Sequence, residues 1–339
     1  MYRYIRPLLF KLDPEVAHSL TIQLLRLVAA IPGIRQAAKA LFCGPRKPVE
    51  AFSLVFPNCI GLAAGYDKDG CGWRGLSLLG FGHIELGTVT PRPQSGNPRP
   101  RVFRLIEERA MINRMGFPGS GADHLAGRMA HKPTSDLILG VNLGKNMDTP
   151  LEDAISDYLD LLRVFAPLAD YLVINVSSPN TVGLRQLQAF NALSPLLSQL
   201  DRERRLEEAR LSRRVPILVK LAPDLTEKEL DQALQVILET RMDGVVATNT
   251  TIDRTGLRSH SADERGGLSG APLKQKSTQM IRGIYKFTDG KLPIIGSGGV
   301  MSASDAREKL DAGAILVQVY TGLVYSGPGL VKEILAKVP

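Results

Sequence analysis

Eight short apolar segments of the chain end in side chains that could bind a ligand or take part in chemistry. The segments are CIGLAA (59–64), HIELGTV (83–89), LILGVNL (137–143), YLVINVS (171–177), PILVKLA (216–222), GVVATNT (244–250), PIIGSGG (293–299) and AILVQVY (314–320). The polar residues in or just after them include Asp67, Lys68, Thr88, Asn142, Asn175, Ser178, Asn180, Lys220, Thr248, Asn249, Thr250, Tyr320 and Thr321. Buried polar groups are costly unless they are paired. Their recurrence at one end of each segment therefore indicates a shared binding site.

Each of these residues also has an ordinary explanation when it is taken alone. An Asn at a strand end is more often a turn former than a ligand. Lys220 lies within an apolar run and could simply pair with a buried carboxylate. Packing does not readily explain eight polar endings on one rim, and the segment from Asn175 to Asn180 is the most polar of them.

Helix-like segments follow the apolar runs, for example at 151–165, 226–240, 272–287 and 302–312. Continuous apolar strands that alternate with amphipathic helices predict parallel strands buried on both faces. Eight such units predict an α/β fold, the closed (β/α)8 TIM barrel, whose active sites lie at the carboxyl ends of the strands. An open doubly wound sheet is the alternative. It usually has fewer strands, and the Gly-rich turns here follow the last two strands instead of the first.

Two segments are too long for plain connections between a strand and a helix. Residues 90–136 and 249–271 are rich in Gly, Pro and charged residues. Both follow strands at the end where a barrel has its active site. We therefore expect them to be lids or substrate loops.

The last two strand endings suggest a phosphate site. Gly298-Gly299 and Thr321-Gly322 precede expected helix starts at 302–305 and 327–329. Glycines allow close approach, and the N–H groups of a helix start can hold a phosphate. Two ordinary tight turns are the alternative. Asn and Thr side chains, a buried Lys and one phosphate pocket suit FMN.

Other cofactors and chemistries lack their sequence signatures. The chain has no G-x-G-x-x-G after an early strand, so we do not expect a bound dinucleotide. It has no G-x-S-x-G segment of the kind that carries an acyl-transfer serine. The five histidines (18, 83, 124, 131 and 260) are scattered, and we expect no metal site.

The first 47 residues form a basic, helical extension, and residues 48–339 form the predicted catalytic barrel domain. Asp13-Pro14-Glu15 is a helix start, and Val16, Leu20, Leu24 and Leu27 then recur at helical spacing. Pro32-Gly33 ends that helix, a shorter one follows to Leu41, and 44–48 is a linker. Two interpretations stay open. The helices pack on the barrel as a small pair, or they present an amphipathic patch to a membrane.

The composition limits the compartment and the partners. The chain of 339 residues is 44% hydrophobic and has a formal charge of +8, but no apolar run reaches the roughly 20 residues of a membrane span. The chain has no signal-peptide core, and its three cysteines are an odd number without a C-x-x-C pair, which favours the cytoplasm. Nucleic-acid binding is not expected, because acidic residues interrupt the basic run 202–214 and no aromatic residue accompanies it.

Several segments closely resemble dihydroorotate dehydrogenase, and the likeness spans essentially the whole chain. These are GLAAGYDKDG (61–70), GTVTPRPQ (87–94), NRMGF (113–117), NVSSPNTVGLR (175–185), KLAPDL (220–225), ATNTT (247–251), GGLSG (266–270) and IIGSGGV (294–300). Ser178 stands where the soluble class 1 enzymes of that family carry a catalytic Cys. This serine and the N-terminal extension with His18 make the chain similar to the membrane-associated, quinone-linked class 2.

The resemblance implies a set of functional residues. FMN would be held by Ala64, Gly65, Tyr66, Asp67, Lys68, Thr88, Asn142, Asn175, Lys220, Thr248, Gly270, Gly299, Tyr320 and Thr321. Dihydroorotate would be held by Lys68, Asn113, Arg114, Met115, Gly116, Phe117, Asn175, Asn180, Asn249 and Thr250. Ser178 would be the base for the C5 proton, with hydride passing from C6 to flavin N5. His18 and Arg104 would lie near the quinone entrance.

The resemblance also implies a role in the cell. The chain would oxidise (S)-dihydroorotate to orotate in de novo pyrimidine biosynthesis, as a peripheral protein on the cytoplasmic face of the inner membrane. A monomer is the expected state, and a soluble acceptor such as fumarate or NAD is the alternative to quinone. Two positions depart from the family pattern: Pro118-Gly119 replaces a polar pair, and Tyr66 stands where Leu or Phe is common.

Overall fold

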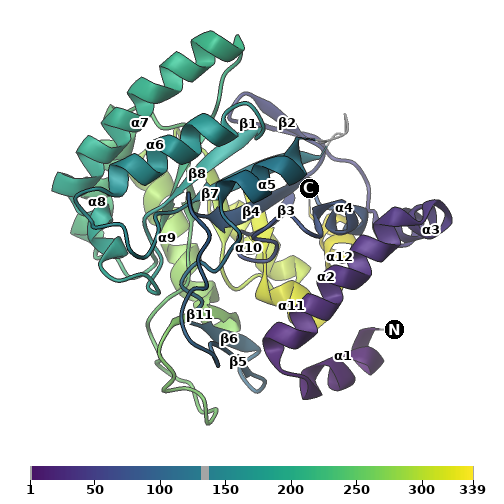
Figure 1. Ribbon diagram of the computed structural model, residues 1–339. Coiled ribbons are helices and arrows are strands. Elements are labelled where there is room, and N and C mark those ends of the chain that lie inside the picture. The colour runs from purple at the N-terminus through teal and green to yellow at the C-terminus, as the bar shows by residue number, and fades with distance from the viewer. Residues whose placement is uncertain (1, 131–136, 339) are drawn as a thin grey trace.

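The structure is a computed structural model that describes residues 2–130 and 137–338. His131 and the end of the long segment 90–136 lie outside the described residues. Eight parallel strands close into a barrel with helices around it, which confirms the predicted (β/α)8 TIM barrel (Figure 1). Around the barrel the strands follow in the order β10 (Gly244–Ala247), β12 (Ile294–Ser297), β13 (Leu316–Val319), β3 (Ile60–Leu62), β4 (His83–Val89), β7 (Ile138–Leu143), β8 (Tyr171–Asn175) and β9 (Ile217–Leu221).

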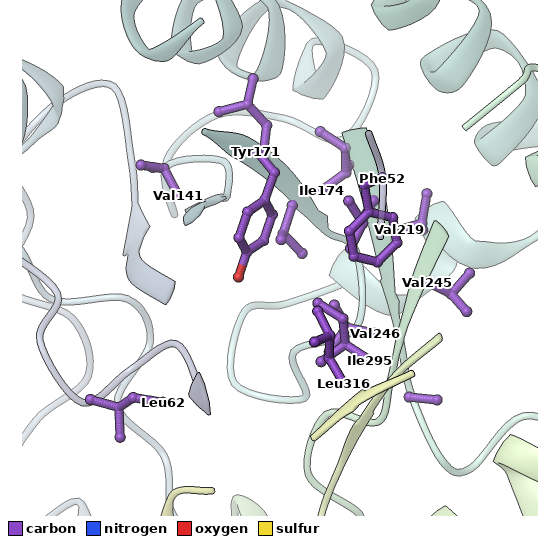
Figure 2. Close-up of a cluster of buried hydrophobic side chains, with 14 of the residues drawn as sticks. Phe52, Leu62, Val141, Tyr171, Ile174, Val219, Val245, Val246, Ile295 and Leu316 are labelled. Atoms are coloured by element: carbon purple, nitrogen blue, oxygen red, sulfur yellow. The ribbon is translucent and has the colours of Figure 1, made fainter. Parts of the chain in front are cut away.

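Every predicted apolar segment forms one barrel strand. Most strands are shorter than their segments, because the polar endings leave the hydrogen-bonded ladder and turn towards the site. All residues of β8 and β9 are buried. Figure 2 shows Val141, Ile174 and Val219 among the buried apolar side chains of the strands. A buried side chain of this size contributes about 1.5–3 kcal/mol to folding.

The helices predicted after four of the strands are present. They are α6 (Ala154–Phe165), α8 (Glu227–Glu239), α9 (Lys274–Phe287) and α10 (Ala303–Asp311). The remaining elements around the barrel are α4 (Trp73–Leu76), η1 (Ser77–Leu79), η2 (Leu184–Gln188), α7 (Phe190–Leu211), η3 (Ala271–Leu273), α11 (Thr321–Ser326) and α12 (Leu330–Leu335). Thr226 and Glu229 form a capping box that starts α8. Such a cap contributes about 1 kcal/mol to stability.

Three helices at the N-terminus lie beside the barrel, next to α11 and α12 (Figure 1). They are α1 (Tyr2–Lys11), α2 (Pro14–Ala30) and α3 (Pro32–Phe42). The predicted start of α2 is confirmed, since Asp13 Oδ1 accepts hydrogen bonds from the N–H groups of Glu15 at 2.9 Å and Val16 at 3.1 Å. One detail differs from the prediction. Pro32 does not only end α2; it is also the first residue of α3, a position that tolerates the missing N–H.

The apolar repeat of α2 stays half exposed. Val16, Leu20, Leu24 and Leu27 are each at least half exposed, and α2 buries only Ala17 and Ile22. The helix backbone instead approaches α4 closely, where a Cβ on Gly75 would lie 2.2 Å from the carbonyl oxygen of Leu25. Among the described residues no single helix is long and apolar enough to cross a membrane. α2 and α3 reach the required length and composition only together, bent by 110°.

Regular structure occurs within the two long segments that were expected to be loops. β5 (Val102–Leu105), β6 (Ala110–Asn113) and β11 (Gly267–Gly270) form an antiparallel sheet, and α5 (Ala122–Met129) follows β6. The strands pair Gly267 with Asn113, so the sheet joins the two segments. These strands were not predicted because they are short and only partly apolar, and their pairing partner lies far away in the chain.

A hairpin of β1 (Val49–Ala51) and β2 (Leu54–Phe56) was also not predicted. Phe52, at its turn, packs against the start of β10, where a Cβ on Gly244 would lie 2.5 Å from the Phe52 ring. Phe52 belongs to the apolar cluster in Figure 2. The hairpin therefore covers the amino-terminal end of the barrel and leaves the carboxyl end for the site.

Candidate active site

A cavity opens at the carboxyl ends of the barrel strands, and we call it the barrel-mouth cavity. Most of the predicted FMN and substrate residues line it: Ala64, Gly65, Lys68, Thr88, Asn113, Met115, Gly116, Phe117, Asn175, Asn180, Lys220, Thr248, Asn249, Thr250, Gly270, Gly299, Tyr320 and Thr321, together with Ser178. It is also lined by Gly298 and Gly322 of the predicted phosphate turns, and by residues that were not singled out as ligands: Ala63, Ser269, Leu273, Ser297, Val300, Met301 and Gln318. The barrel thus brings together residues that are far apart in the sequence.

Four predicted residues do not line this cavity. Tyr66 faces a second cavity, described below. The Asp67 carboxylate accepts hydrogen bonds from the N–H groups of Cys71 and Gly72, so it shapes its own loop. Asn142 is fully buried behind the cavity wall. Arg114 pairs with Glu264, and its guanidinium also donates to the carbonyl of Pro100.

Asparagine and threonine side chains form a connected network at the ends of β4, β7 and β8. Asn175 Nδ2 donates to Thr88 Oγ1 and to Asn142 Oδ1, both at 2.9 Å, and Thr88 Oγ1 donates to Asn142 Oδ1 at 2.5 Å. Asn249 Nδ2 in turn donates to Asn175 Oδ1 at 3.2 Å and to Ser177 Oγ at 2.9 Å. Reciprocal bonds of this kind hold the amide groups in one orientation.

Ser178 lies in the loop after β8 and is 4% exposed. Its Oγ accepts a hydrogen bond from the N–H of Asn180 at 3.2 Å. Asn180 Nδ2 donates to Asn113 Oδ1 at 3.1 Å, which connects this loop to β6. In the described part of the chain Asn180 Oδ1 is buried without a hydrogen-bond partner, so it is an acceptor for a bound N–H group.

Arg185 holds the same loop in place, and the sequence reasoning did not single it out as a functional residue. Its guanidinium donates to the carbonyl of Ser177 at 3.1 Å, to Asp224 Oδ2 at 2.9 Å and to the carbonyl of Thr250 at 2.9 Å. It therefore ties the Ser178 loop to the segment after β10. A possible sequence signal is that Arg185 closes the segment NVSSPNTVGLR, but an arginine in a loop is usually read as a surface residue.

The turn after β12 has the geometry of a phosphate cradle. Gly298 and Gly299 have φ of +110° and +73°, which few other residues adopt. A Cβ on Gly299 would lie 2.4 Å from Lys274 Cα, so only glycine fits there. Ser302 caps α10 as expected. The helix start expected at 327–329 is that of α12, whose N-cap is Gly329, and an additional short helix, α11, begins at Thr321 itself.

Lys220 lines the cavity and also pairs with a buried carboxylate. Its Nζ lies 3.4 Å from Glu85 Oε1, and both side chains are almost completely buried. Lys220 therefore has the buried carboxylate partner of the ordinary explanation and also the position in the cavity wall that the functional explanation requires. Glu85 was not singled out, although a carboxylate inside the apolar run HIELGTV was a signal of the same kind as Lys220.

A second cavity, the helix-side cavity, lies between the N-terminal helices and the barrel. Most of its wall is apolar and includes Leu9, Phe10, Ala17, Leu20, Leu24, Val28, Leu78, Leu79, Val102, Leu323 and Val324. His18 and Arg104, both predicted at the quinone entrance, line it. It shares Gly65, Lys68, Asn113, Met115, Ser269 and Tyr320 with the barrel-mouth cavity.

Aromatic side chains stand where the two cavities meet. The rings of His18 and Tyr66 are 5.0 Å apart, and those of Tyr66 and Tyr320 are 5.6 Å apart, both edge to face. Arg104 donates to the carbonyl of Leu12 at 2.8 Å, which fixes the corner between α1 and α2. Tyr66, a departure from the family pattern, thus belongs to the wall between the cavities.

Removal from water shifts the pKa of the ionisable groups in this wall. Burial, followed by the charge of Arg101, lowers the pKa of Lys68 to about 8. Burial and the charge of Lys68 lower the pKa of His18 to about 4, so the imidazole is neutral near pH 7. Burial raises the pKa of Tyr320 to about 12. Shifted groups that line cavities are common at functional sites.

The described residues contain no group of three or more His, Cys, Asp or Glu side chains that could hold a metal ion. The donors at the barrel mouth are amides, hydroxyls, two lysines and backbone groups. Such a set suits an organic ligand that carries carbonyl, N–H and phosphate groups.

Comparisons with known proteins agree with this geometry. A family model described as dihydroorotate dehydrogenase matches residues 48–339. Proteins named dihydroorotate dehydrogenase (quinone) are similar along the chain. The one from Azotobacter vinelandii is 49% identical over 98% of this chain and 95% of its own length. The one from Escherichia coli is 47% identical over 99% of each.

Solved structures show the same fold. The ligand-free enzyme of this type from Eimeria tenella is 38% identical, with a TM-score of 0.85 over 96% of this chain and 94% of that one. Its complex with ferulenol has a TM-score of 0.86 over 96% and 90%. The match of the family model and the identity along the whole chain show that this protein belongs to the dihydroorotate dehydrogenase family.

Proposed function

We propose that the protein oxidises (S)-dihydroorotate to orotate with FMN as its cofactor and a quinone as the electron acceptor, in de novo pyrimidine biosynthesis. The observation that carries this proposal is the pair of cavities with a common wall at Lys68 and Tyr320. One cavity is polar and contains Ser178, and the other is apolar and opens beneath the N-terminal helices. A polar substrate and a hydrophobic acceptor could thus approach one cofactor from separate sides.

The residues of the barrel mouth fit FMN. Gly298 and Gly299 form a cradle that a Cβ would fill, which suits a phosphate. We expect Ala64, Gly65, Lys68, Thr88, Asn175, Lys220, Thr248, Gly270, Gly299, Tyr320 and Thr321 to contact FMN. When bound, FMN supplies the acceptor for the hydride and passes the electrons on to quinone.

Asn142 and Asp67 support the FMN site from behind the cavity wall, whereas the sequence predicted that they contact FMN directly. Asn142 orients Thr88 and Asn175. Asp67 holds the loop that carries Lys68, through the N–H groups of Cys71 and Gly72. Tyr66 lies on the quinone side of the same loop.

Ser178 is the base that removes the C5 proton of dihydroorotate. Proton loss beside a carbonyl builds negative charge on that oxygen, and the Lys68 ammonium, which lines the cavity, is a donor that stabilises it. Asn113, Asn180, Thr250 and the backbone of 113–117 hold the substrate. A serine hydroxyl is a weak base, so it needs activation or a water relay that carries the proton away.

The quinone binds in the helix-side cavity, with the N-terminal segment 1–47 as its access domain. Exposed Val16 and Leu27 lie on this segment outside the lining of the helix-side cavity, and the segment also carries Arg3, Arg6 and Arg26. An apolar face flanked by basic residues suits the surface of an anionic membrane. We place the protein as a peripheral monomer on the cytoplasmic face of the inner membrane.

The purified protein tests the proposal directly. It should show the absorption of a flavin, release FMN on denaturation, and lose that absorption when dihydroorotate is added without oxygen. A ubiquinone analogue should restore the absorption, whereas fumarate or NAD should not. Folded protein without a flavin spectrum contradicts the proposal, and restoration by fumarate or NAD replaces quinone with a soluble acceptor.

A further inference from the structure

The proposed reaction leaves one buried carboxylate of the barrel interior without a role. The side chain of Glu85, on β4, has no exposed surface. Its Oε1 accepts hydrogen bonds from Asn142 Nδ2 at 2.7 Å and from Lys220 Nζ at 3.4 Å. Its Oε2 accepts one from Gln318 Nε2 at 2.7 Å. Three donors from three other strands thus converge on one carboxylate, and two of them, Lys220 and Gln318, line the barrel-mouth cavity.

A carboxylate only accepts hydrogen bonds, so its neighbours must turn their N–H groups towards it. Because the Asn142 amide donates to Glu85, its oxygen faces Thr88 and Asn175 and accepts from both. The NH₂ group of Asn175 is therefore used towards Asn142, and its oxygen is left to accept from Asn249. The direction of every amide in this chain follows from the acceptor at its buried end.

Glu85 also changes the charge that the cavity wall presents. The Lys220 side chain is 6% exposed, and Glu85 is the carboxylate within 4 Å of its ammonium. In a dry interior, opposite charges at this distance largely compensate each other for a third group nearby. A ligand beside Lys220 therefore meets a nearly neutral pair and not a full positive charge.

We propose that Glu85 is a positioning residue of the cofactor site. It fixes the direction of the amide chain from Asn142 to Asn249, and it weakens the positive charge that Lys220 presents to FMN. The inference rests on the proposed function, since it takes FMN as the ligand. It adds a determinant of the reduction potential of the flavin that lies behind the cavity wall.

The substitution Glu85→Gln separates charge from geometry. The retained Oε1 still accepts from Asn142 and Lys220, and the new NH₂ group faces Gln318. Gln318 can turn its amide over and accept that N–H, because its own Oε1 has no partner among the described residues. The fold should therefore tolerate the loss of the negative charge.

The experiment compares the midpoint potential of FMN in the wild-type holoenzyme and in Glu85→Gln, by dye equilibration of both proteins at the same pH. Loss of the negative charge should favour the electron-rich reduced flavin. We expect the ratio of reduced to oxidised flavin at a given potential to rise about tenfold, which is about 30 mV for two electrons. A ratio within twofold of the wild-type value, with FMN still bound, overturns the inference.

Asp243→Asn is a matched control at the other end of the barrel. Asp243 is also a buried carboxylate paired with a cation, since its Oδ2 lies 2.8 Å from Arg204 Nη1 and also accepts the N–H of Ile217. This variant should be less stable than the wild type but have an unchanged flavin potential. An equal shift in both variants would mean that the shift reflects general loosening of the barrel, and it would also overturn the inference.

A second substitution tests the geometric part. Glu85→Leu removes the acceptor, so Asn142 has no reason to keep its amide direction. We expect the Kd for FMN to rise at least tenfold in Glu85→Leu and to stay within about threefold of the wild-type value in Glu85→Gln. Equal affinities in all three proteins would show that Glu85 does not orient the chain.

If both Glu85 variants fail to fold, Gln318→Met remains. It removes a hydrogen-bond donor from the Glu85 carboxylate, whose negative charge is then less well compensated. The flavin potential should therefore move down, with a two- to threefold change in the ratio of reduced to oxidised flavin. An upward shift or no shift contradicts the proposal. Wild-type protein without FMN is a different result, because it contradicts the proposed function before Glu85 is tested.

Discussion

The barrel-mouth cavity and the helix-side cavity share a wall, yet different parts of the fold hold them. The first is formed by the ends of fully buried strands, and its side chains bond to one another, as Asn175 bonds to Thr88, Asn142 and Asn249. The second has the barrel on one side and α1 and α2 on the other. α1 buries none of its described residues, and α2 buries only Ala17 and Ile22.

This difference indicates how each cavity is used. Side chains fixed by reciprocal hydrogen bonds cannot adapt without leaving buried groups unpaired, so the barrel mouth suits chemistry that needs fixed donors. Helices with few buried residues move away from the barrel at a small cost in free energy. Their apolar side chains also require no particular hydrogen-bond geometry of a ligand. The helix-side cavity therefore suits a hydrophobic ligand that enters and leaves at each turnover.

The largest test of this division is Ser178→Ala. If chemistry is confined to the barrel mouth, reduction of bound FMN by dihydroorotate should fall about 10²- to 10⁴-fold, because the base is lost. FMN content and reoxidation by quinone should stay unchanged. Stopped-flow absorbance of the flavin measures both half-reactions separately. Reduction at a near-normal rate would remove Ser178 from the mechanism. Ser178→Cys tests whether a cysteine can replace the serine as the base.

The next test concerns the outer face of the helices. Val16→Asp combined with Leu27→Asp should weaken binding to anionic vesicles about 100-fold, because two half-exposed apolar side chains can no longer enter the membrane. Flavin reduction by dihydroorotate should not change. Vesicle cosedimentation measures the binding. Leu206→Asp, an equally exposed leucine on α7, is the control and should bind like the wild type; equal binding by all variants would place the membrane face elsewhere.

Much of the barrel and its rim could be predicted from the sequence. Strands buried on both faces leave uninterrupted apolar runs, and polar residues such as Asn175 and Lys220 then stand out against them. The closed topology brings these endings together whatever their order in the chain, so 18 of the predicted cofactor and substrate residues line one cavity.

The rest depends on contacts that a one-dimensional pattern does not contain. Periodicity showed that Leu20 and Leu24 share a helix face, but not that this face stays half exposed and lines the helix-side cavity. The pairing of β6 with β11 joins segments about 150 residues apart, and no local sequence pattern predicts it. Asn142 had the right strand and the right end, but only the register shows that its amide turns towards Glu85 and not towards the cavity.

The pH dependence of ligand binding sharpens the role of the common wall. Lys68 has a pKa of about 8, so its ammonium is present below that pH and is lost as the pH rises through it. Affinity for the orotate anion should therefore fall about tenfold between about pH 7 and pH 9. Titration of the flavin spectrum with orotate measures the Kd. Lys68→Arg keeps its charge over this range and should show a flat profile; a profile like that of the wild type would assign the effect to another group.

The smallest expected effect distinguishes contact from proton transfer on the quinone side. His18 touches Tyr66 edge to face and has a pKa of about 4, so the imidazole is neutral and carries no extra proton near neutral pH. His18→Phe keeps the ring contact and removes one polar group, and the KM for a ubiquinone analogue should rise about fivefold, the value of one hydrogen bond. Reduction by dihydroorotate should stay within twofold. The wild-type rate of quinone turnover should also show no titration between about pH 5 and pH 7, because the pKa of His18 lies below this range. A titration near pH 6 that disappears in His18→Phe would contradict this assignment, and it would show that the apolar cavity contains a proton donor after all.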